Sequence, residues 1–519
     1  MNTKALRQKI LDLAIRGKLV PQDPNDEPAS VLLERIRAEK QQMVKDGKLK
    51  PKDIKNDSII FKGEDNLHYE KFPDSTVKCI EDEIPFELPQ GWEWCRLYHV
   101  SEIVTGSTPN KKKPEYYGND FPFFKPADLE QGSNVVYASE YLSFKGKNAS
   151  RVIPAGSTAV CCIGSIGKCG YLQKEGTTNQ QINSIVPYVY NKYVYYYCLS
   201  DFFVEQLLLE SSATTIAIVN KNKMSNVFIP IPPAHEQKRI VAKLNEYTSI
   251  IDTIETNQTD LKTTIHLTKS KILDLAIRGK LVPQDPNDEP ASVLLERIRA
   301  EKEELIRQGK IKRDKKESVI YKGDDNSYYE KIGDTTRNIN DELPFELPEG
   351  WCWCRGNNCF RPMESRKPTG DIFKYIDIDS IDNKHQQIKE AKLLPTEKAP
   401  SRASRAVYEG SVLFSLVRPY LKNIALVNNA DADSIASTGF YICTTNGTYI
   451  PDFLYLLMIS PYVVNGLNQF MKGDNSPSIN KDDIEKWLYP VPPLTEQKRI
   501  FTLCLSMIEM LTDIEKSLS

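Results

Sequence analysis

Apolar residues recur at alternating spacings of four and three along the middle of the chain. The series is Ile240, Leu244, Tyr247, Ile251, Ile254, Leu261, Ile265, Ile272 and Leu275. Only Gln258 and Thr268 interrupt the register with polar side chains. A heptad pattern of this length is typical of a coiled-coil helix. We therefore predict one helix from Glu236 to Arg278, roughly 64 Å long, that starts after Pro232–Pro233 and stops at Gly279.

The C-terminal residues repeat the beginning of this pattern. The apolar positions there are Ile500, Cys504, Met507, Leu511, Ile514 and Leu518. Thr3–Arg16, at the other end of the chain, matches Ile265–Arg278 in the second part of the central helix. The sequence thus predicts two equal units, cut inside one long helix, with neighbouring termini. If a two-fold axis relates the units, the central helix pairs antiparallel with a helix assembled from the two ends; two unrelated helical hairpins are the alternative.

A block of residues occurs twice, letter for letter, as Lys9–Lys40 and Lys271–Lys302. Weaker matches pair Ser58–Lys71 with Ser318–Lys331, Asp82–Arg96 with Asp341–Arg355, and Pro230–Ile240 with Pro490–Ile500. The period is about 260 residues, far above that of a repeat array, so the pattern indicates a duplicated domain. A fold needs only the hydrophobic pattern. Identity therefore indicates either two equivalent docking surfaces for one partner or recent gene conversion.

Each copy of the block predicts a second helix followed by a charged stretch. Pro28 is suited to open a helix from Ala29 to about Lys45, and Gly47 to end it. The basic residues that follow are Lys48, Lys50, Lys52 and Lys55, and in the other copy Lys310, Lys312, Arg313, Lys315 and Lys316. Such a run is either a solvated surface or a site for phosphate or a partner.

Between the matching parts, Leu97–Ile229 and Gly356–Tyr489 share little sequence. Short alternating runs predict mixed sheets with a few helices in both. We expect strands at Ala159–Ile163, Ile372–Ile378, Ser411–Leu416 and Gly439–Thr444, and helices at Lys192–Glu210 and Asp452–Met471. The predicted class is α+β, with two mixed domains joined by long antiparallel coiled-coil helices in a circularly permuted, pseudo-two-fold duplication. The predicted segments are 1–80 (helical), 81–233 (first variable domain), 234–340 (central helix and repeated block), 341–493 (second variable domain) and 494–519 (C-terminal helix).

Composition limits the function classes. The chain has 519 residues, 40% of them hydrophobic, which suits two or three ordinary globular domains. Its net charge of −2 means that any contact with nucleic acid needs a local basic patch. The 11 irregularly spaced cysteines favour a reducing, cytoplasmic setting. Neither a signal peptide at Met1–Arg16 nor an apolar run long enough for a membrane is predicted.

The sequence lacks the motifs of common catalytic sites. Gly164–Lys168 does not have the spacing of a phosphate-binding loop. Neither a glycine-rich S-adenosylmethionine loop nor an Asn-Pro-Pro-aromatic methylation motif is present. Two cysteine groups lack the CxxC and His pairs of zinc sites, so no metal is expected: Cys161, Cys162 and Cys169, and Cys352, Cys354 and Cys359. We predict a chain without catalysis of its own.

Two variable segments, each closed by PxPPxxEQxRI and a long helix, resemble the specificity subunit of type I restriction–modification systems. The most specific parts are Pro230–Ile240 and Pro490–Ile500, together with the duplicated order. Further segments that look like family motifs are Thr105–Tyr117, Asn179–Asn183, Tyr375–Asp377, Ser415–Pro419 and Ser437–Phe440. One departure is the extension of the helical region by Ala29–Lys71 and its copy.

The resemblance implies a DNA-binding subunit of a cytoplasmic phage-defence complex. Each variable domain would be a target-recognition domain that reads one half of a bipartite, asymmetric site. The helices would set the spacer and dock two methyltransferase subunits, and two restriction–translocase subunits would complete the complex. S-adenosylmethionine, ATP and Mg²⁺ would belong to those partners. The alternative is a coiled-coil scaffold that binds no DNA.

Basic, aromatic and amide side chains in the variable segments are the candidates for DNA contact, because they suit phosphates and base edges. In the first domain they are Lys111, Lys112, Lys113, Tyr116, Tyr117, Gln180, Gln181, Asn183, Lys221 and Lys223. In the second domain they are Arg402, Arg405, Arg418, Lys422, Ser476, Ser478 and Lys481. The candidates for partner binding are Glu236, Gln237, Arg239, Glu496, Gln497, Arg499, Arg16, Lys18, Arg278 and Lys280.

Overall fold

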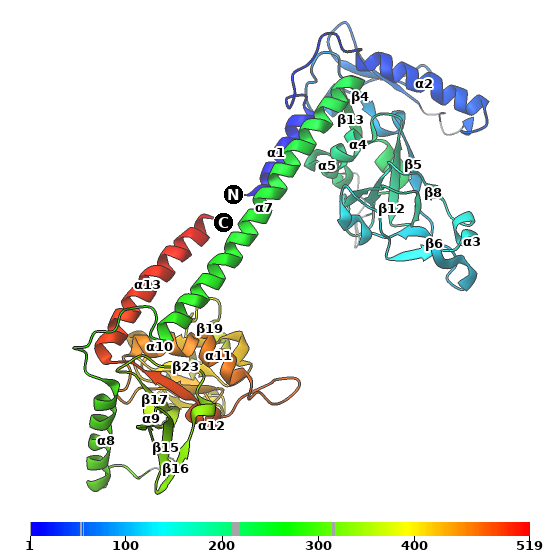
Figure 1. Ribbon diagram of the computed structural model, residues 1–519. Helices are drawn as coiled ribbons and strands as arrows, with labels where there is room; N and C mark the ends of the chain where they lie inside the picture. Colours follow the sequence, from blue (N-terminus) through cyan, green and yellow to red (C-terminus); the bar gives the residue numbers. More distant parts are fainter. Residues whose placement is uncertain (1, 52–53, 55–56, 210–217, 314–316, 519) are drawn as a thin grey trace. The chain divides into compact units, whose positions relative to one another are not determined.

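The computed structural model describes residues 2–51, 54, 57–209, 218–313 and 317–518. The chain forms two compact units, 1–257 and 258–519, which are seen in Figure 1. The residues of our predictions that lie outside the described part are Met1, Lys52, Lys55, Glu210, Lys315, Lys316 and Ser519. The mixture of helices and strands expected from the sequence is confirmed, whereas the five segment boundaries stay a prediction.

One long helix, α7 (Ala234–Ile277), passes through the boundary between the units. It agrees within two residues with the helix predicted from the heptad pattern. Five heptad residues are at most 3% exposed: Ile240, Leu244, Ile251, Ile265 and Ile272. Leu261 departs from the pattern, with 40% of its surface exposed.

In unit 1, helix α1 (Thr3–Ile15) packs beside the first part of α7 (Figure 1). The Arg7 guanidinium lies 2.5 Å from Asp252 and 3.0 Å from Glu255. Gln22, beyond the end of α1, donates to Glu236 near the start of α7. The two helices therefore run antiparallel.

In unit 2, helix α13 (Leu494–Ser517) packs in the same way beside the second part of α7. Lys269 and Glu515 form an ion pair at 2.8 Å. In the internal alignment these two residues match Arg7 and Glu255, so the same contact occurs in both units.

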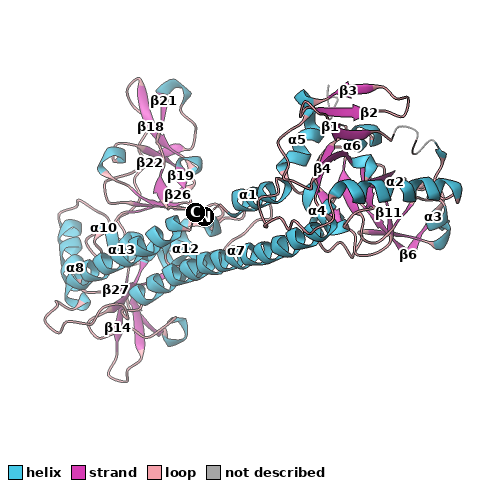
Figure 2. Ribbon diagram, turned by 90° about the horizontal axis from the view of Figure 1, so that it is seen from above, coloured by secondary structure: helices cyan, strands magenta, loops and turns pink. Residues whose placement is uncertain are grey.

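The repeated block and the weaker match that follows it form the same pair of elements in each unit, a helix and a three-stranded antiparallel sheet (Figure 2). Helix α2 (Ala29–Lys45) has the predicted bounds, and α8 (Ala291–Arg307) is its copy. The sheet strands are β1 (Ile59–Lys62), β2 (His68–Lys71) and β3 (Val77–Cys79), and β14 (Ser318–Lys322), β15 (Tyr328–Ile332) and β16 (Thr335–Asn338). The sequence pattern did not predict these strands.

The variable part of unit 1 is framed by two paired strands, β4 (Glu93–Arg96) and β13 (Phe228–Ile231). Between them lie two four-stranded sheets, of order β10-β9-β12-β5 and β7-β6-β11-β8. Their strands are β5 (Ser101–Thr105), β6 (Tyr117–Phe124), β7 (Glu140–Leu142), β8 (Val152–Ile153), β9 (Thr158–Cys161), β10 (Cys169–Tyr171), β11 (Gly176–Thr178) and β12 (Ile182–Pro187). The helices are α3 (Phe144–Asn148), α4 (Asn191–Cys198), α5 (Asp201–Leu209) and α6 (Lys221–Ser225).

The variable part of unit 2 is framed by β17 (Cys352–Arg355) and β27 (Leu488–Val491). The sheets have the orders β21-β18-β25-β22, β24-β23-β26 and β19-β20. Their strands are β18 (Ile372–Ile376), β19 (Ile381–Asp382), β20 (Gln387–Ile388), β21 (Lys392–Pro395), β22 (Ala403–Ala406), β23 (Val412–Ser415), β24 (Ile424–Leu426), β25 (Ile435–Ser437) and β26 (Phe440–Cys443). The helices are α9 (Gly356–Cys359), α10 (Pro451–Ile459), α11 (Pro461–Asn468) and α12 (Lys481–Lys486).

The four predicted strands are present as β9, β18, β23 and β26, but each of the two predicted helices is divided. α4 and α5 are separated at Ser200, whose hydroxyl accepts from Phe203 N–H at 3.3 Å and restarts the helix. α10 and α11 are separated at Ser460, which caps the second helix in the same way ahead of Pro461. Proline has no N–H to continue a helix, so a new one starts there.

Each unit has its own apolar core, in which its part of α7 and the variable domain meet. In unit 1, Ile240 and Leu244 belong to the same buried cluster as Trp92, Tyr193 and Tyr197. Among the described residues, no helix has both the length and the apolar character needed to cross a membrane. The same residues contain no group of His, Cys, Asp or Glu arranged to hold a metal ion.

Candidate nucleic-acid interface

Three loops of unit 1 meet at one edge of its sheets: the segment after β5, the β9–β10 turn and the β11–β12 turn. Ser107 N–H donates to the carbonyl of Thr178 at 2.9 Å, which joins the first loop to the third. Cys162 N–H donates to the carbonyl of Gln181 at 2.7 Å, which joins the second to the third. Gly106 permits this packing, because a Cβ there would lie 2.1 Å from the carbonyl oxygen of Asn179.

This edge carries six of the predicted contact residues of the first domain. The Thr108 hydroxyl donates to the side-chain oxygen of Gln180, which links the basic loop to the amide loop. Lys113 lies over the ring of Tyr116, 5.2 Å from its centroid, and the Tyr117 hydroxyl donates to the carbonyl of Pro109 at 2.8 Å. The six are Lys111, Lys112, Lys113, Tyr116, Tyr117 and Gln180.

The other candidates of the first domain have different surroundings. Asn183 is 3% exposed and accepts from the Thr105 hydroxyl at 2.8 Å, so its amide supports the sheet and is not presented to a ligand. Gln181 is half-buried and accepts from the Asn179 amide at 2.9 Å. Lys221, on α6, lines a separate cavity of about 1110 Å³ beside Arg96. Lys223 lies on the same short helix.

Unit 2 presents an equivalent edge with different side chains. Leu416 N–H donates to the carbonyl of Gly439 at 2.8 Å, and Thr438 N–H donates to the carbonyl of Arg402 at 2.9 Å. The 472–478 segment joins them, because Arg418 N–H donates to the carbonyl of Pro477 at 2.8 Å. The residues brought together are Arg402, Arg418, Lys422, Ser476 and Ser478.

The two remaining candidates of the second domain are Arg405 and Lys481. Arg405, on β22, has a buried Nε atom without a hydrogen-bond partner in the described part of the chain. Lys481 forms an ion pair with Glu485 at 3.1 Å along α12.

Two further arginines lie at these edges and had no signal in the sequence. Arg151 donates to the carbonyl of Thr105 at 2.8 Å, at the beginning of the basic loop. Arg366 lies over the ring of Tyr408, 5.3 Å from its centroid. Neither belongs to a longer basic run such as Lys111–Lys113, and contacts between segments distant in the sequence place them there.

The residues of the PxPPxxEQxRI motifs mostly have internal roles. Glu236 and Glu496 are each 1% exposed and accept from an indole N–H, Trp92 at 3.0 Å and Trp351 at 2.9 Å. Burial raises the pKa of both carboxyl groups. Their glutamine neighbours are just as enclosed, which corrects our expectation that these four side chains face a partner. The glutamines are Gln237, which donates to Pro232 O, and Gln497, which donates to Pro492 O.

The arginines predicted to bind a partner contact side chains of their own unit but keep part of their surface exposed. Arg239 lies 2.6 Å from Asp26, and Arg499 lies 2.5 Å from Asp288. Arg16 and Arg278 lie over phenylalanine rings, at 4.3 Å and 4.4 Å from the centroids. Lys18 and Lys280 are exposed in both copies.

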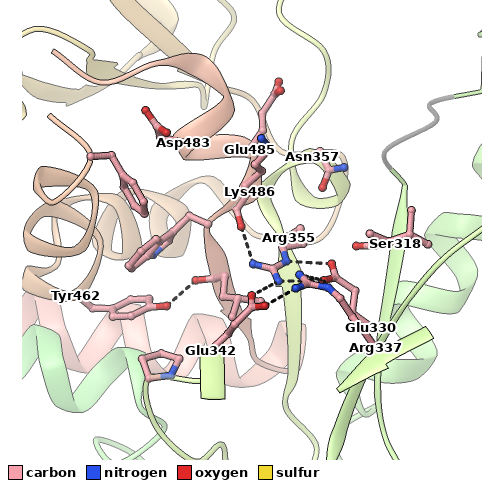
Figure 3. Close-up of a pocket in the computed structure, with 15 residues that line it drawn as sticks. Ser318, Glu330, Arg337, Glu342, Arg355, Asn357, Tyr462, Asp483, Glu485 and Lys486 are labelled. Atoms are coloured by element: carbon pink, nitrogen blue, oxygen red, sulfur yellow. Dashed lines mark hydrogen bonds and ion pairs between the residues drawn. The ribbon is translucent and has the colours of Figure 1, made fainter. Parts of the chain in front are cut away.

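A charged cluster attaches the three-stranded sheet of unit 2 to its variable domain (Figure 3). Glu330 of β15 is 2% exposed and accepts from Arg355 at 3.0 Å and from Arg337 at 2.6 Å. Both arginines also contact Glu342. Burial favours the neutral form of Glu330, but the hydrogen bonds from the two arginines outweigh it and lower the pKa to about 2. The cluster lines a cavity of about 730 Å³.

Unit 1 repeats this cluster with one substitution. Arg96 lies 2.9 Å from Glu70 and 3.1 Å from Glu83. Lys78 contacts Glu83 at 2.6 Å, in the position of Arg337. Arg96 and Arg355 therefore make equivalent ion pairs that fix the three-stranded sheet to the variable domain in both units.

Comparison with known proteins gives relatives of one kind. The model of the "Type I restriction modification DNA specificity domain" matches residues 89–263. The EcoAI specificity subunit of Escherichia coli is 27% identical over 98% of this chain and 89% of its own length. The EcoEI specificity subunit of the same species is 29% identical over 80% of this chain and 73% of its own. The chain is thus similar over most of its length to specificity subunits of type I restriction enzymes.

The fold of this chain has a counterpart among solved structures. A chain from a type I restriction–modification complex, 18% identical, superposes with a TM-score of 0.51 over 84% of this chain and 94% of that chain. The HsdS subunit of Thermoanaerobacter tengcongensis is 36% identical over 33% of this chain and 46% of its own, with a TM-score of 0.32.

Proposed function

We propose that this chain is a specificity subunit that recognises a bipartite, asymmetric DNA target, with each variable domain reading one half. The observation that carries the proposal is the pair of equivalent loop edges. One presents Lys111–Lys113 with Gln180, and the other presents Arg402, Arg418 and Lys422. Equivalent position supports a shared task, and different side chains support different half-sites.

We assign the repeated parts to spacing and assembly. A pseudo-two-fold arrangement, in which α7 would pair with a helix made from α13 and α1, would hold two readers in opposite orientations. Helix length then sets the separation of the half-sites. Identical exposed surfaces in both copies, including Lys18 and Lys280, fit two identical methyltransferase subunits. Two restriction–translocase subunits would join the complex.

The chemistry of the complex would lie in the partner subunits. They would supply S-adenosylmethionine for methyl transfer, and ATP and Mg²⁺ for translocation and cleavage. The residues of this subunit would bind and orient the DNA. Restriction of foreign DNA in the cytoplasm is the biological role that follows.

Mapping of methylated bases in the genome tests the function. Cells would express this subunit with its methyltransferase partner, and a control strain would express the partner alone. We expect one split, non-palindromic motif that depends on this subunit. The alternative, a helical scaffold without DNA binding, predicts no methylation even when the partner is active. Binding to DNA that does not depend on sequence would also contradict our proposal. Binding that is sequence-dependent and falls steeply with salt would exclude the scaffold.

A further inference from the structure

The β23–β24 turn of unit 2 has a backbone that side chains disfavour. Arg418 and Lys422, at its two ends, have φ angles of 47° and 54°. Both lie in the left-handed region. A Cβ atom there clashes with the backbone, whereas glycine has no Cβ and adopts the conformation freely. Between them, Pro419–Leu421 forms the short 3-10 helix η9. Residues held in such conformations concentrate at ligand-binding sites.

Unit 1 contains a corresponding turn between β9 and β10, which is one residue shorter, and the strand pairing fixes the matching positions at its two ends. Cys169 pairs with Val160 next to the turn of unit 1, and Ile424 pairs with Phe414 next to the turn of unit 2. The strands that flank the two turns therefore correspond residue by residue.

A side-chain bond at the start of each turn confirms this alignment. The Cys161 thiol donates to the carbonyl of Ile163 at 3.3 Å, and the Ser415 hydroxyl donates to the carbonyl of Val417 at 2.8 Å. In each turn the bond joins a residue to the carbonyl two residues later, and the residue after that carbonyl is the first left-handed one.

The two turns differ in which residues take the left-handed conformation. In unit 1 they are Gly164 and Gly167, with φ angles of 80° and 83°. In unit 2 Arg418 takes the place of Gly164, and Lys422, two residues before the next strand, takes the place of Gly167. Glycine therefore satisfies this backbone, and the shape of the turn gives no reason for two long basic side chains. Their reason must lie outside the turn.

The surroundings hold the turn of unit 2 rigidly and leave its charges available. The Arg418 guanidinium donates to the carbonyl of Asn475 at 2.7 Å, which fixes the direction of the side chain. Pro419 is buried, whereas Tyr420 and Leu421 are 46% and 40% exposed. Within the described part of the chain, neither Arg418 nor Lys422 has an acidic partner.

We infer that the 416–423 turn enters a groove of the DNA half-site read by unit 2, where Arg418 contacts the edge of a guanine and Lys422 an adjacent phosphate. A guanidinium presents paired donors that match the two acceptors of guanine, and a fixed guanidinium loses little freedom on binding. A lysine is suited to phosphate as a point charge. The inference rests on the proposed function, and gives unit 2 a reading element that unit 1 replaces with glycines.

The variant Arg418→Gly separates a role in recognition from a role in the fold. Glycine accepts the backbone, so the melting temperature of the complex with its methyltransferase should hold or rise. Affinity for a duplex carrying the intact target should fall roughly 5- to 100-fold. Each guanine of the second half-site is then replaced in turn. At one of these positions, the replacement should remove the difference in affinity between the wild type and the variant. Preference within the first half-site should not change.

Two further variants complete the design. Gln386 is also left-handed, with a φ angle of 52°, on the β19–β20 turn of the same unit. Gln386→Gly relieves the same kind of strain and should leave DNA binding unchanged. Lys422→Gly should weaken binding to all sequences alike and reduce the salt slope by about one.

Three results with Arg418→Gly would overturn the inference: wild-type affinity, an equal loss on all sequences, or a melting temperature that falls with the loss of binding. A wild-type complex without sequence preference is a separate outcome, because it contradicts the proposed function itself.

Discussion

Glu330 is the residue whose charge contributes most clearly to the attachment of a repeated sheet. Its pKa falls from an ordinary 4.5 to about 2 because two arginines donate to it. The ionised form therefore stabilises the folded state above about pH 4.5, and this contribution is lost as the pH falls toward 2. We expect it to amount to about 2 kcal/mol after screening by solvent.

The variant Glu330→Gln should remove this contribution. Its free energy of unfolding at pH 7 should be lower, because Arg337 and Arg355 lose their buried partner, and should change less between pH 5 and pH 2. Denaturant unfolding across that range measures both effects. Glu342→Gln is the matched control, since Glu342 contacts the same arginines with 38% of its side chain exposed. Equal effects of the two variants would contradict the importance of burial.

Two neighbouring tryptophans of unit 2 allow a test of the buried carboxylate. The Trp351 indole donates to Glu496, whereas the Trp353 indole is buried without a hydrogen-bond partner among the described residues. Trp351→Phe should destabilise the protein by roughly 1–3 kcal/mol more than Trp353→Phe, because only the first leaves a buried polar group unpaired. Thermal unfolding of both variants at neutral pH is the measurement, and similar losses would show that packing alone matters there.

At the scale of elements, Gly17 determines how the loop after α1 packs. Its φ angle is 65°, and a Cβ would lie 2.4 Å from Pro89. Gly47, which ends α2 with a φ angle of 70°, has open space around it. Gly47→Ala should therefore cost only the left-handed strain, about 1–2 kcal/mol, and Gly17→Ala clearly more.

Unit 2 allows the same comparison between two glycines, because Gly279 and Gly309 are the counterparts of Gly17 and Gly47. A Cβ on Gly279 would lie 2.3 Å from Pro348, and Gly309 again has open space. Chemical denaturation of the four alanine variants should give two large and two small losses. A large loss at Gly47 or Gly309 would mean that the strain, and not the contact with proline, dominates.

Local patterns predicted the elements that depend on local signals. α7 and α2 were found from heptad spacing, Pro and Gly, and the strand β23 from its run of apolar residues. The division of α10 and α11 was missed because the apolar pattern continues across Ser460. The small sheets were missed because their exposed strands, such as β3 and β16, carry little hydrophobic alternation.

The candidate site shows the same division between local and distant information. Lys113 and Tyr116 lie together because they are neighbours in one loop, as the sequence indicated. The placement of Arg151 beside Thr105 depends on strand pairing that no local pattern encodes. The left-handed backbone of Arg418 runs against residue preference, so the sequence alone points away from it.

At the scale of the whole molecule, the framing strands make each variable domain an insertion with adjoining ends. Phe228 of β13 pairs directly with Arg96 of β4, so the chain leaves the domain beside the point where it entered. In unit 2, Leu488 pairs with Arg355 in the same way. A domain attached through one strand pair can be replaced without altering the helices that would carry the other reader.

Exchange of residues 97–229 for the corresponding segment of another specificity subunit should therefore change one half of the methylated motif and leave the other half and the spacer unchanged. The exchange keeps β4 and the second half of β13, and with them the pairs of Pro230 with Trp94 and of Ile231 with Glu93 at the ends of the domain. Methylation mapping in cells with the same methyltransferase gives the result, and exchange of 356–487 is the reciprocal control. A change in both halves would mean that the two domains read the site jointly, because separate readers on separate insertions can only change one half at a time.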